Sequence, residues 1–299
     1  MVKFFSIIII LSLALFQETA AGSQDVVVIQ SLRVKPYDDA LLGFKSALPG
    51  RIKKLLLPET DGADAVRAVR EARPGLILAI GAEALAKVRR IKDIPIVYLM
   101  VLNPHTLLQG EDNITGVSMS IPPEMQFAAM QKVIPHIRRV GLLYDPGKTG
   151  FLVKKAQLAA RGAGIELMAR EVHRTKDVPE LINSMKDTVQ AFWMIPDTTV
   201  VTPETVNFLL LFSLENRIPI LAFSGKYVEA GALMSLDINA FNLGKQAGEA
   251  ARKILSGTHV REVPRIDAKN VVLSINTKTA KKLGIAVSDE VMARARKVR

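Results

Sequence analysis

Short apolar runs alternate with stretches of helical periodicity along the chain from about residue 25 to the end. The runs are rich in Val, Ile and Leu and have the length of buried strands, whereas the stretches between them repeat apolar residues at helical spacing. We expect strands at 25–31, 54–57, 76–80, 95–102, 113–118, 139–144, 165–171, 191–195, 218–223, 231–236 and 270–275. We expect helices at 38–48, 61–72, 82–90, 121–134, 148–162, 178–188, 203–216 and 240–255, and two more that begin at 276 and 288.

Residues 95–125 form a junction between two similar halves. A buried strand ends in the polar turn Asn103-Pro104-His105, a brief second strand follows at 113–118, and Pro122-Pro123 ends it. Mostly apolar strands that alternate with helices are typical of a parallel sheet covered on both faces. The pattern therefore predicts an α/β protein with two doubly wound parallel-sheet lobes joined by a multi-strand hinge.

The late segments are free to return to the first lobe. We expect residues 23–120 plus 226–262 in lobe 1, and residues 121–225 plus 263–299 in lobe 2. Several chain crossings between two lobes make a hinge.

The first residues have the pattern of a signal peptide, which we place at 1–22. Lys3 supplies a positive charge, residues 4–16 are almost entirely apolar, and Thr19-Ala20-Ala21 offers small residues for cleavage. The alternative is an uncleaved anchor helix, but the apolar run is short for a membrane span. The pattern predicts an exported protein.

The sequence contains no cysteine. Disulfides, thiolate metal sites and a lipid-carrying cysteine after the signal are therefore excluded. Because exported eukaryotic domains of this size usually carry disulfides, we expect a bacterial periplasmic protein that is not a lipoprotein. The net charge of +11 is spread over several clusters, and aromatic residues make up only 5%. Nucleic-acid binding would need a basic surface with stacking aromatics, so nucleic acid is not an expected partner.

Ligands of doubly wound sheets bind beyond the carboxyl ends of the strands, near the reversal in strand order. Two such edges that face each other would make a cleft, although each residue alone is also what an ordinary turn uses. The polar and aromatic residues at these strand ends, and just after them, are our candidates for ligand binding: Tyr37, Ala82, Asn103, His105, Tyr144, Asp197, Thr198, Phe223 and Asp237.

The sequence gives little support to catalysis, and we expect no enzyme, no metal and no cofactor. The four histidines are scattered without the spacing of metal ligands, and the serines lack a G-x-S-x-G elbow. Asp145 and Asp197 could meet across a cleft as acid and base, but carboxylates at strand ends equally well hold a ligand.

Several motifs resemble one known family in order and spacing. They are Asn113-Ile-Thr-Gly-Val-Ser118, the strand that ends Tyr144-Asp145-Pro146, Ile195-Pro-Asp-Thr198, Gly231-Ala-Leu and the terminal Ala280-Lys-Lys-Leu-Gly-Ile. The sequence resembles the substrate-binding proteins of ABC transporters of the tryptophan- and tyrosine-uptake type, which have the type I periplasmic-binding fold. The resemblance covers essentially the whole chain after the signal.

The resemblance implies a receptor that closes on a small solute and delivers it to the membrane permease of an ABC transporter, as a monomer. Its matching positions give Tyr37, Ala82, Asn103, Asp197 and Asp237 as ligand contacts. Many relatives have Thr where Ala82 stands and Asp where Asn103 stands. These changes remove polar groups, which leaves open an amino-acid-like ligand or a different, less polar organic solute.

Two other functions remain open on the sequence alone. The protein could be a ligand-sensing ectodomain partner of a chemoreceptor or sensor kinase, or an exported enzyme that uses the cleft between the lobes.

Overall fold

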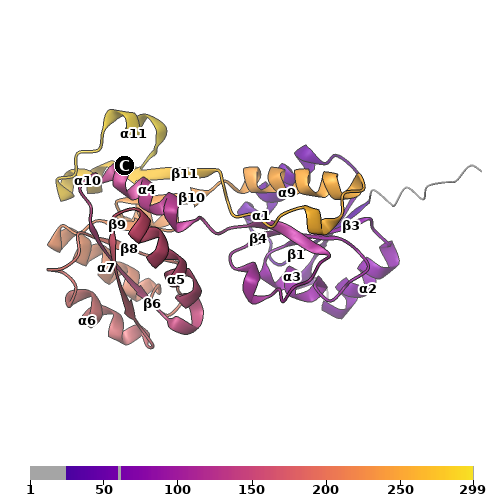
Figure 1. Ribbon diagram of the computed structural model, residues 1–299, viewed down its shortest axis with the longest axis horizontal. Coiled ribbons are helices and arrows are strands. Elements are labelled where there is room, and N and C mark those ends of the chain that lie inside the picture. The colour runs from indigo at the N-terminus through magenta and orange to yellow at the C-terminus, as the bar shows by residue number, and fades with distance from the viewer. Residues whose placement is uncertain (1–24, 60–61, 299) are drawn as a thin grey trace, which may run out of the picture.

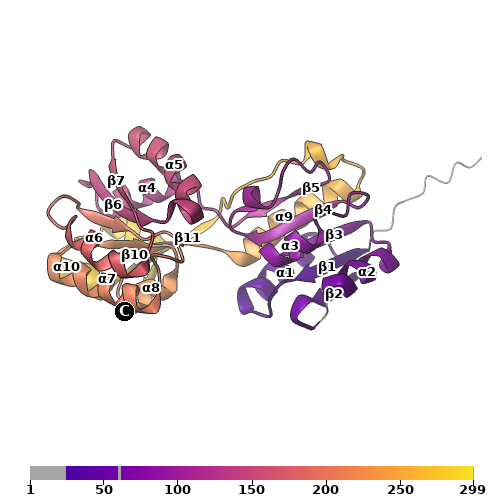
Figure 2. The same cartoon turned by 90° about the horizontal axis from the view of Figure 1, so that it is seen from below.

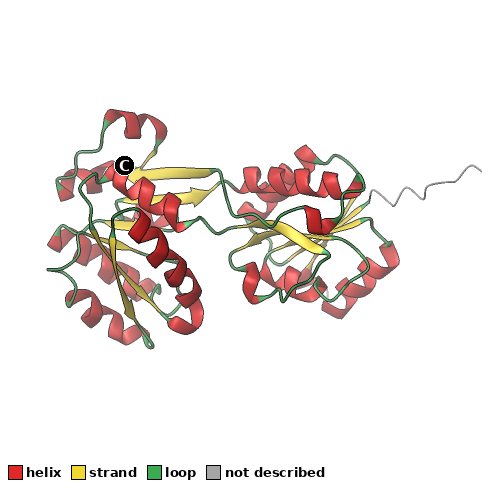
Figure 3. Cartoon of the chain, in the orientation of Figure 1, coloured by secondary structure: helices red, strands yellow, loops and turns green. Residues whose placement is uncertain are grey.

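The structure is a computed structural model that describes residues 25–59 and 62–298. The expected signal peptide at residues 1–22 lies outside the described residues. Two lobes stand side by side and are joined by a narrow bundle of chain segments (Figure 1). Each lobe is a sheet with helices on both sides (Figure 3), so the predicted two-lobed α/β architecture is confirmed.

The first lobe has a five-stranded parallel sheet in the order β2-β1-β3-β4-β5. Its strands are β1 (Val26–Gln30), β2 (Ile52–Leu56), β3 (Leu76–Ile80), β4 (Ile96–Val101) and β5 (Ile114–Ser118). Its helices are α1 (Lys35–Ala47), α2 (Gly62–Ala72), α3 (Ala82–Val88) and α9 (Ala240–Leu255), with short 3₁₀ turns at Leu57–Glu59, Pro104–Thr106 and Val260–Glu262.

The second lobe has a seven-stranded sheet in the order β12-β11-β10-β9-β8-β6-β7, parallel except where β10 meets β11. Its strands are β6 (Arg139–Tyr144), β7 (Glu166–Glu171), β8 (Ala191–Trp193), β9 (Ile220–Ala222), β10 (Met234–Ile238), β11 (Val271–Asn276) and β12 (Arg296–Val298). Its helices are α4 (Pro123–Val133), α5 (Pro146–Gly162), α6 (Val178–Asn183), α7 (Pro203–Asn216), α8 (Gly225–Ala230), α10 (Thr277–Leu283) and α11 (Asp289–Arg294), with a 3₁₀ turn at Thr175–Asp177.

The central strands, such as β1, β3, β4 and β8, are apolar because both of their faces are buried. In β1, Val26 and Val28 join one hydrophobic cluster while Val27 and Ile29 join the cluster on the opposite face. In β8 the same alternation sends Trp193 to one side of the second sheet, where its ring packs edge-on against Phe127 at 5.2 Å. Side chains that alternate across a strand covered on both faces therefore favour apolar residues at every position.

The pairing of β10 corrects one expected boundary. We expected residues 226–262 in lobe 1, but β10 pairs with β9 and β11, so 226–238 lie in the second lobe. The return to lobe 1 begins at Asn239, which caps α9 by accepting a hydrogen bond from the N–H of Asn242 at 3.0 Å. At its other end the returning segment reaches Ile266, which bridges Val117 of β5. Residues 239–266 therefore belong with lobe 1, which also corrects 263–266, expected in lobe 2.

Helix α9 lies against α1, so segments about 200 residues apart in sequence share one layer (Figures 1 and 2). The two helices approach so closely that a Cβ atom added to Gly244 would lie 1.8 Å from the carbonyl oxygen of Ala40. Glycine at this crossing is required by the space available rather than by backbone conformation.

Within the described residues the chain passes between the lobes three times, at about 119–122, 239 and 267–270. Two of the crossings are hydrogen-bonded together, because the N–H of Ala268 donates to the carbonyl of Ser120 at 3.0 Å. The Ser118 hydroxyl adds a 2.5 Å hydrogen bond to Asp267 Oδ1. We expected the first hinge crossing at 113–118, but residues 114–118 form β5 of the first sheet, so the crossing follows them, and α4 begins at Pro123 in the second lobe.

Candidate functional site

The carboxyl ends of the two sheets face each other across the hinge. In the first sheet the strand order reverses between β1 and β3, and in the second it reverses between β6 and β8. Ligands of such sheets bind at these reversals. The loops after β4, β6, β8 and β9 and the hinge segments line two cavities at this position. We call them together the interlobe cleft.

The larger cavity has a volume of about 460 Å³ and a mainly apolar wall. It is lined by Pro36, Met100, Leu102, Met119, Ser120, Ile121, Gln126, Leu152, Pro196, Phe223, Ser224, Lys226, Leu236, Asp237, Ile238 and Ala240. Residues from both lobes and from the hinge contribute. A cavity of this size accommodates a small organic molecule.

The smaller cavity has a volume of about 310 Å³, and six of the ten residues that line it have polar side chains. It is lined by Leu102, Asn103, Thr106, Ser120, Lys148, Thr149, Phe151, Leu152, Pro196 and Thr198. Four of these residues, Leu102, Ser120, Leu152 and Pro196, also line the larger cavity. The two cavities are therefore neighbouring parts of one cleft.

Met100 enters the larger cavity because of an irregularity in β4. The register of β4 against β5 shifts between Leu99 and Val101, and Met100 between them has a left-handed backbone with φ of 57°. A bulge redirects a side chain that a regular strand would point elsewhere. This is an uncommon backbone conformation for a residue other than glycine, and it lies at the cleft.

Asp197 is fully buried beneath the rim of the smaller cavity. Its Oδ2 accepts hydrogen bonds from the N–H of Asp145 at 2.8 Å and from the hydroxyl of Thr149 at 2.5 Å. Its Oδ1 accepts from the N–H groups of Thr199 at 2.9 Å and Val200 at 3.3 Å. Both carboxylate oxygens are thus occupied by the protein, and the residue joins the ends of β6 and β8.

Asp237 lines the larger cavity but is also engaged by its own lobe. Its Oδ1 accepts from the N–H of Gly225 at 2.6 Å, and its Oδ2 accepts from the hydroxyls of Ser235 at 2.7 Å and Ser274 at 3.3 Å. Arg296 lies next to this group of hydrogen bonds, because its Nε donates to the Ser274 hydroxyl at 3.1 Å. The carboxylate therefore joins the start of α8 and strand β11 to β10.

Asp145 lies at the end of β6 and caps α5. Its Oδ2 accepts from the Thr199 hydroxyl at 2.7 Å, and its Oδ1 accepts from the N–H of Gly147 at 2.9 Å. The Thr199 hydroxyl first, and then the Gly147 N–H, hold the pKa of the Asp145 carboxyl below its usual value, with smaller contributions from Lys148 and His173. The lowered pKa keeps this carboxyl ionised at neutral pH.

Asn103 supplies an open polar group. Its Oδ1 is buried and has no hydrogen-bond partner among the described residues. The residue follows β4 and lines the smaller cavity. A buried acceptor without a partner has a free-energy cost, and a ligand that donates a hydrogen bond to it would remove that cost.

Two lysines bring positive charge to the cleft. Lys148, on the first turn of α5, donates to the Thr198 hydroxyl at 2.8 Å. Lys226, on the first turn of α8, has its ammonium 4.7 Å from the centre of the Tyr227 ring. That ring packs edge-on against Phe223 at 5.0 Å.

Of the residues that the sequence singled out, the structure brings four together at the cleft wall, namely Asn103, Thr198, Phe223 and Asp237. Asp197 lies beneath them. His105 is exposed beside the smaller cavity, on the 3₁₀ turn Pro104–Thr106.

Three further candidates do not line these two cavities. Tyr37 and Ala82 lie at the carboxyl edge of the first sheet, around Gly81, whose φ is 97°. A Cβ at Gly81 would lie 2.9 Å from the Tyr37 ring, so the turn brings the ring close to the strand end. Burial, and then the charge of Glu83, raises the pKa of Tyr37. Tyr144 turns outward and donates its hydroxyl to Glu171 at 3.1 Å.

Sequence reasoning missed most of the apolar wall and both lysines. Met100 depends on the bulge in β4, which the apolar run 95–102 does not reveal. Lys226 begins a short helix, α8, that we did not expect. A signal for it was available, because Ser224-Gly225-Lys226 directly follows a strand end that we had placed at the cleft.

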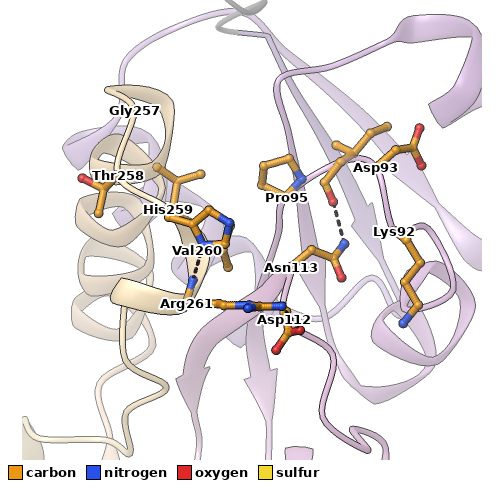
Figure 4. A pocket seen from close by; sticks show the side chains of 12 residues that line it. Lys92, Asp93, Pro95, Asp112, Asn113, Gly257, Thr258, His259, Val260 and Arg261 are labelled. Atoms are coloured by element: carbon orange, nitrogen blue, oxygen red, sulfur yellow. Dashed lines mark hydrogen bonds and ion pairs between the residues drawn. The ribbon is translucent and has the colours of Figure 1, made fainter.

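Other cavities lie away from the cleft. One of about 450 Å³ lies at the far end of lobe 1, between the starts of β4 and β5 and the end of α9 (Figure 4). Its polar groups bind each other: Asn113 donates to the carbonyls of Ile91 and Ile94, Arg261 pairs with Asp112, and His259 Nδ1 accepts from the Arg261 N–H. Another, of about 550 Å³, lies between α4, β11 and α11 in lobe 2. Neither cavity is formed by facing strand ends.

The described ranges contain no group of three or more His, Cys, Asp or Glu residues suited to hold a metal ion. Between residues 25 and 59 and between 62 and 298, no helix combines the length and apolarity that a membrane span requires.

The family model for ABC transporter substrate binding proteins matches residues 54–299. The match covers well over half of the chain, and the fold and the cleft between two lobes agree with it. The protein therefore belongs to the ABC transporter substrate-binding protein family, as the motifs predicted. This is a family of solute-binding proteins, not of enzymes.

Among curated proteins, the chain is 25% identical over 217 residues to a tyrosine-binding protein from Clostridioides difficile, covering 70% of this chain and 62% of that protein. It is also 25% identical over 177 residues to an uncharacterized protein from Rickettsia prowazekii, covering 59% of this chain and 56% of that one. The chain thus spans less than two thirds of the length of the curated relatives it matches.

Solved structures share the fold over most of the chain. The ligand-free, open structure of a substrate binding protein with adhesive properties from Clostridium difficile is similar with a TM-score of 0.79 and 21% identity, covering 92% of this chain and 99% of that one. An ABC domain in complex with L-Trp from Streptococcus pneumonia is similar with a TM-score of 0.63 and 22% identity, covering 93% and 100%.

Proposed function

We propose that this protein is an exported receptor that closes its two lobes on a small organic solute and delivers the solute to an ABC permease. The observation that supports the proposal most directly is the shared wall of the two cavities. Residues of lobe 1, the hinge and lobe 2 meet there, at the carboxyl ends of both sheets. Closure around a bound molecule would bury it between these walls.

Asn103 and Thr198 provide polar contacts from opposite lobes, and Phe223 provides an apolar surface. Tyr37, Ala82 and His105 lie on the lobe 1 side, where closure would bring them towards the ligand. Asp197 and Asp237 hold the strand ends in place. In this proposal the lobes, divided after residue 118 and again near residues 239 and 266, move as two bodies.

The relatives support a small organic ligand. One curated relative is named a tyrosine-binding protein, and one similar structure contains L-Trp. Together with the signal-peptide pattern, family membership supports a periplasmic location, where such receptors work as monomers beside a permease.

A thermal-shift screen of the purified mature protein against amino acids, organic acids, amines, sugars and purines tests solute binding. A solute at a hundredfold excess over its dissociation constant stabilises the folded state by about 2.7 kcal/mol, which raises the melting temperature by several degrees. If no solute in the screen raises the melting temperature, the proposal fails.

Delivery to a permease needs a separate test. Cells that lack the gene should lose high-affinity uptake of the solute found in the screen, and a plasmid copy should restore it. Undiminished uptake in the deletion strain would show that the protein binds the solute for another purpose, such as sensing.

A further inference from the structure

The charged groups at the cleft wall are unequally available to a ligand. The only carboxylate among the residues that line the two cavities is Asp237, and the cations are Lys148 and Lys226. What matters for a ligand is which of these groups the protein has already paired.

The carboxylates are occupied. Asp237 accepts three hydrogen bonds from Gly225, Ser235 and Ser274. Asp197, fully buried behind the wall, accepts from Asp145, Thr149, Thr199 and Val200. A carboxylate that already holds three or four donors has little capacity left for the ammonium group of a ligand.

The two lysines differ in whether the protein has already paired them. Lys148 donates to Thr198 and lies close enough to Asp145 to lower the pKa of that carboxyl. Lys226 has no carboxylate partner among the described residues; its ammonium lies 4.7 Å from the Tyr227 ring centre. Lys226 is therefore the cation that a ligand can neutralise, and it lines the larger, mainly apolar cavity.

Asn103 adds a requirement for a neutral donor. Its buried Oδ1 lacks a partner at the smaller cavity. An ammonium group brings three donors and a full charge, and one amide oxygen satisfies only part of that need. Burial of a cation without a carboxylate has a high cost, whereas a hydroxyl or amide N–H needs only the one acceptor.

We infer that the ligand is a carboxylic acid with an apolar body and a neutral hydrogen-bond donor, and without a cationic group. Its carboxylate binds Lys226, its body contacts the apolar wall around Met100, Leu102 and Leu152, and its donor reaches Asn103. This inference rests on the proposed function and narrows the class of solute. It separates this chain from a receptor for zwitterionic amino acids.

Three compounds with one skeleton test it directly: 3-(4-hydroxyphenyl)propanoate, L-tyrosine and tyramine. The first has the carboxylate without the ammonium, the second has both, and the third has the ammonium alone. A second set, 2-hydroxy-4-methylpentanoate, L-leucine and 3-methylbutylamine, repeats the comparison with an aliphatic body, and here a neutral hydroxyl replaces the ammonium group of leucine. Titration calorimetry of each compound gives the dissociation constants, beside the broad thermal-shift screen.

The inference expects the acid of at least one set to bind at least about tenfold more tightly than its amino acid, and the amine not to bind. If no compound of either set binds but the screen finds another carboxylic acid without a cationic group, that result also supports the inference. Tighter binding of an amino acid or amine, or a sugar or other uncharged solute as the tightest hit, overturns the inference and leaves the receptor function intact. No binding by any solute overturns the receptor function itself.

Substitutions of single lysines test which of them binds the carboxylate of the ligand. Lys226→Gln should weaken binding of the acid about fivefold or more, as loss of one ion pair does. Lys148→Gln should change it less than about twofold, and Lys155→Gln, at an exposed position of α5, should not change it. Equal effects of Lys226→Gln and Lys155→Gln would remove Lys226 from the site. Because all three positions are exposed, unchanged melting temperatures of the free variants will confirm that they fold.

Discussion

The N–H of Asp145 donates to Asp197 Oδ2 at 2.8 Å, which joins the carboxyl ends of β6 and β8 across 52 positions of sequence. Both residues looked from the sequence like groups that could act on a ligand. In the structure one caps a helix and the other is fully buried. Both carboxylates therefore hold the wall of the cleft together, and we expect neighbouring residues to contact the ligand.

Asp197→Asn should therefore destabilise the fold. The amide nitrogen that replaces Oδ2 cannot accept from the Asp145 N–H, and the buried donor loses its partner. We expect a loss of about 2–4 kcal/mol in the free energy of unfolding. Urea denaturation followed by circular dichroism measures it. Asp187→Asn, at an exposed position, is the control and should stay within about 0.5 kcal/mol of the parent. An unchanged stability of Asp197→Asn together with lost ligand binding would contradict this assignment.

The α1–α9 crossing gives a steric prediction. In Gly244→Ala the new methyl group would lie 1.8 Å from the carbonyl oxygen of Ala40, so the helices must move apart. We expect a loss of about 2 kcal/mol or more, as with other overpacked sites. Gly162→Ala is the matched control, because nothing lies within 4 Å of its added Cβ and alanine favours a helix. Denaturation midpoints that fall equally in both variants would show that the crossing is not tightly packed.

The carboxyl of Asp145 gives a prediction on pH. Its pKa is lowered in the folded state, chiefly by the Thr199 hydroxyl, so its contribution to stability is present above the unfolded value of about 3.9 and is lost as pH falls through the folded value. Thr199→Val should raise the Asp145 pKa towards its usual value. Carboxyl chemical shifts followed by NMR measure it.

Asp38 provides an internal control for that titration. Its pKa is lowered chiefly by a hydrogen bond from Lys54, and both residues lie in lobe 1, away from Thr199. The Asp38 titration should therefore be the same in both proteins. An unchanged Asp145 titration in the variant would contradict the assigned hydrogen bond.

Most of the fold could be predicted because buried strands have no polar alternative. Runs such as 76–80 and 95–102 are apolar throughout, and their alternation with helices predicts a parallel sheet covered on both faces. The boundary at 226 was wrong because strand β10 reads like any other strand. Its pairing with β11, which is antiparallel and about 35 residues further on, decides its lobe.

The site was only partly predictable, because contacts between distant segments decide which side chains a ligand can reach. Residues that follow a strand, such as Asn103 and Phe223, reach the cleft by position alone. Whether a carboxylate there is free depends on donors from distant segments: Asp197 is occupied by groups from 145 and 149. No local pattern reveals that occupation, so the sequence suggested ligand contacts where the structure has internal ones.

The distance between the lobes on addition of solute tests the central claim most directly. The chain has no cysteine, so spin labels can be placed at Leu32→Cys, exposed beyond the end of β1, and Lys154→Cys, exposed on α5. Double electron–electron resonance then measures the distance between the labels with and without the solute that raises the melting temperature most. The account predicts a distribution that shifts to shorter distances with solute. An unchanged distribution in a protein saturated with that solute would contradict closure of the cleft.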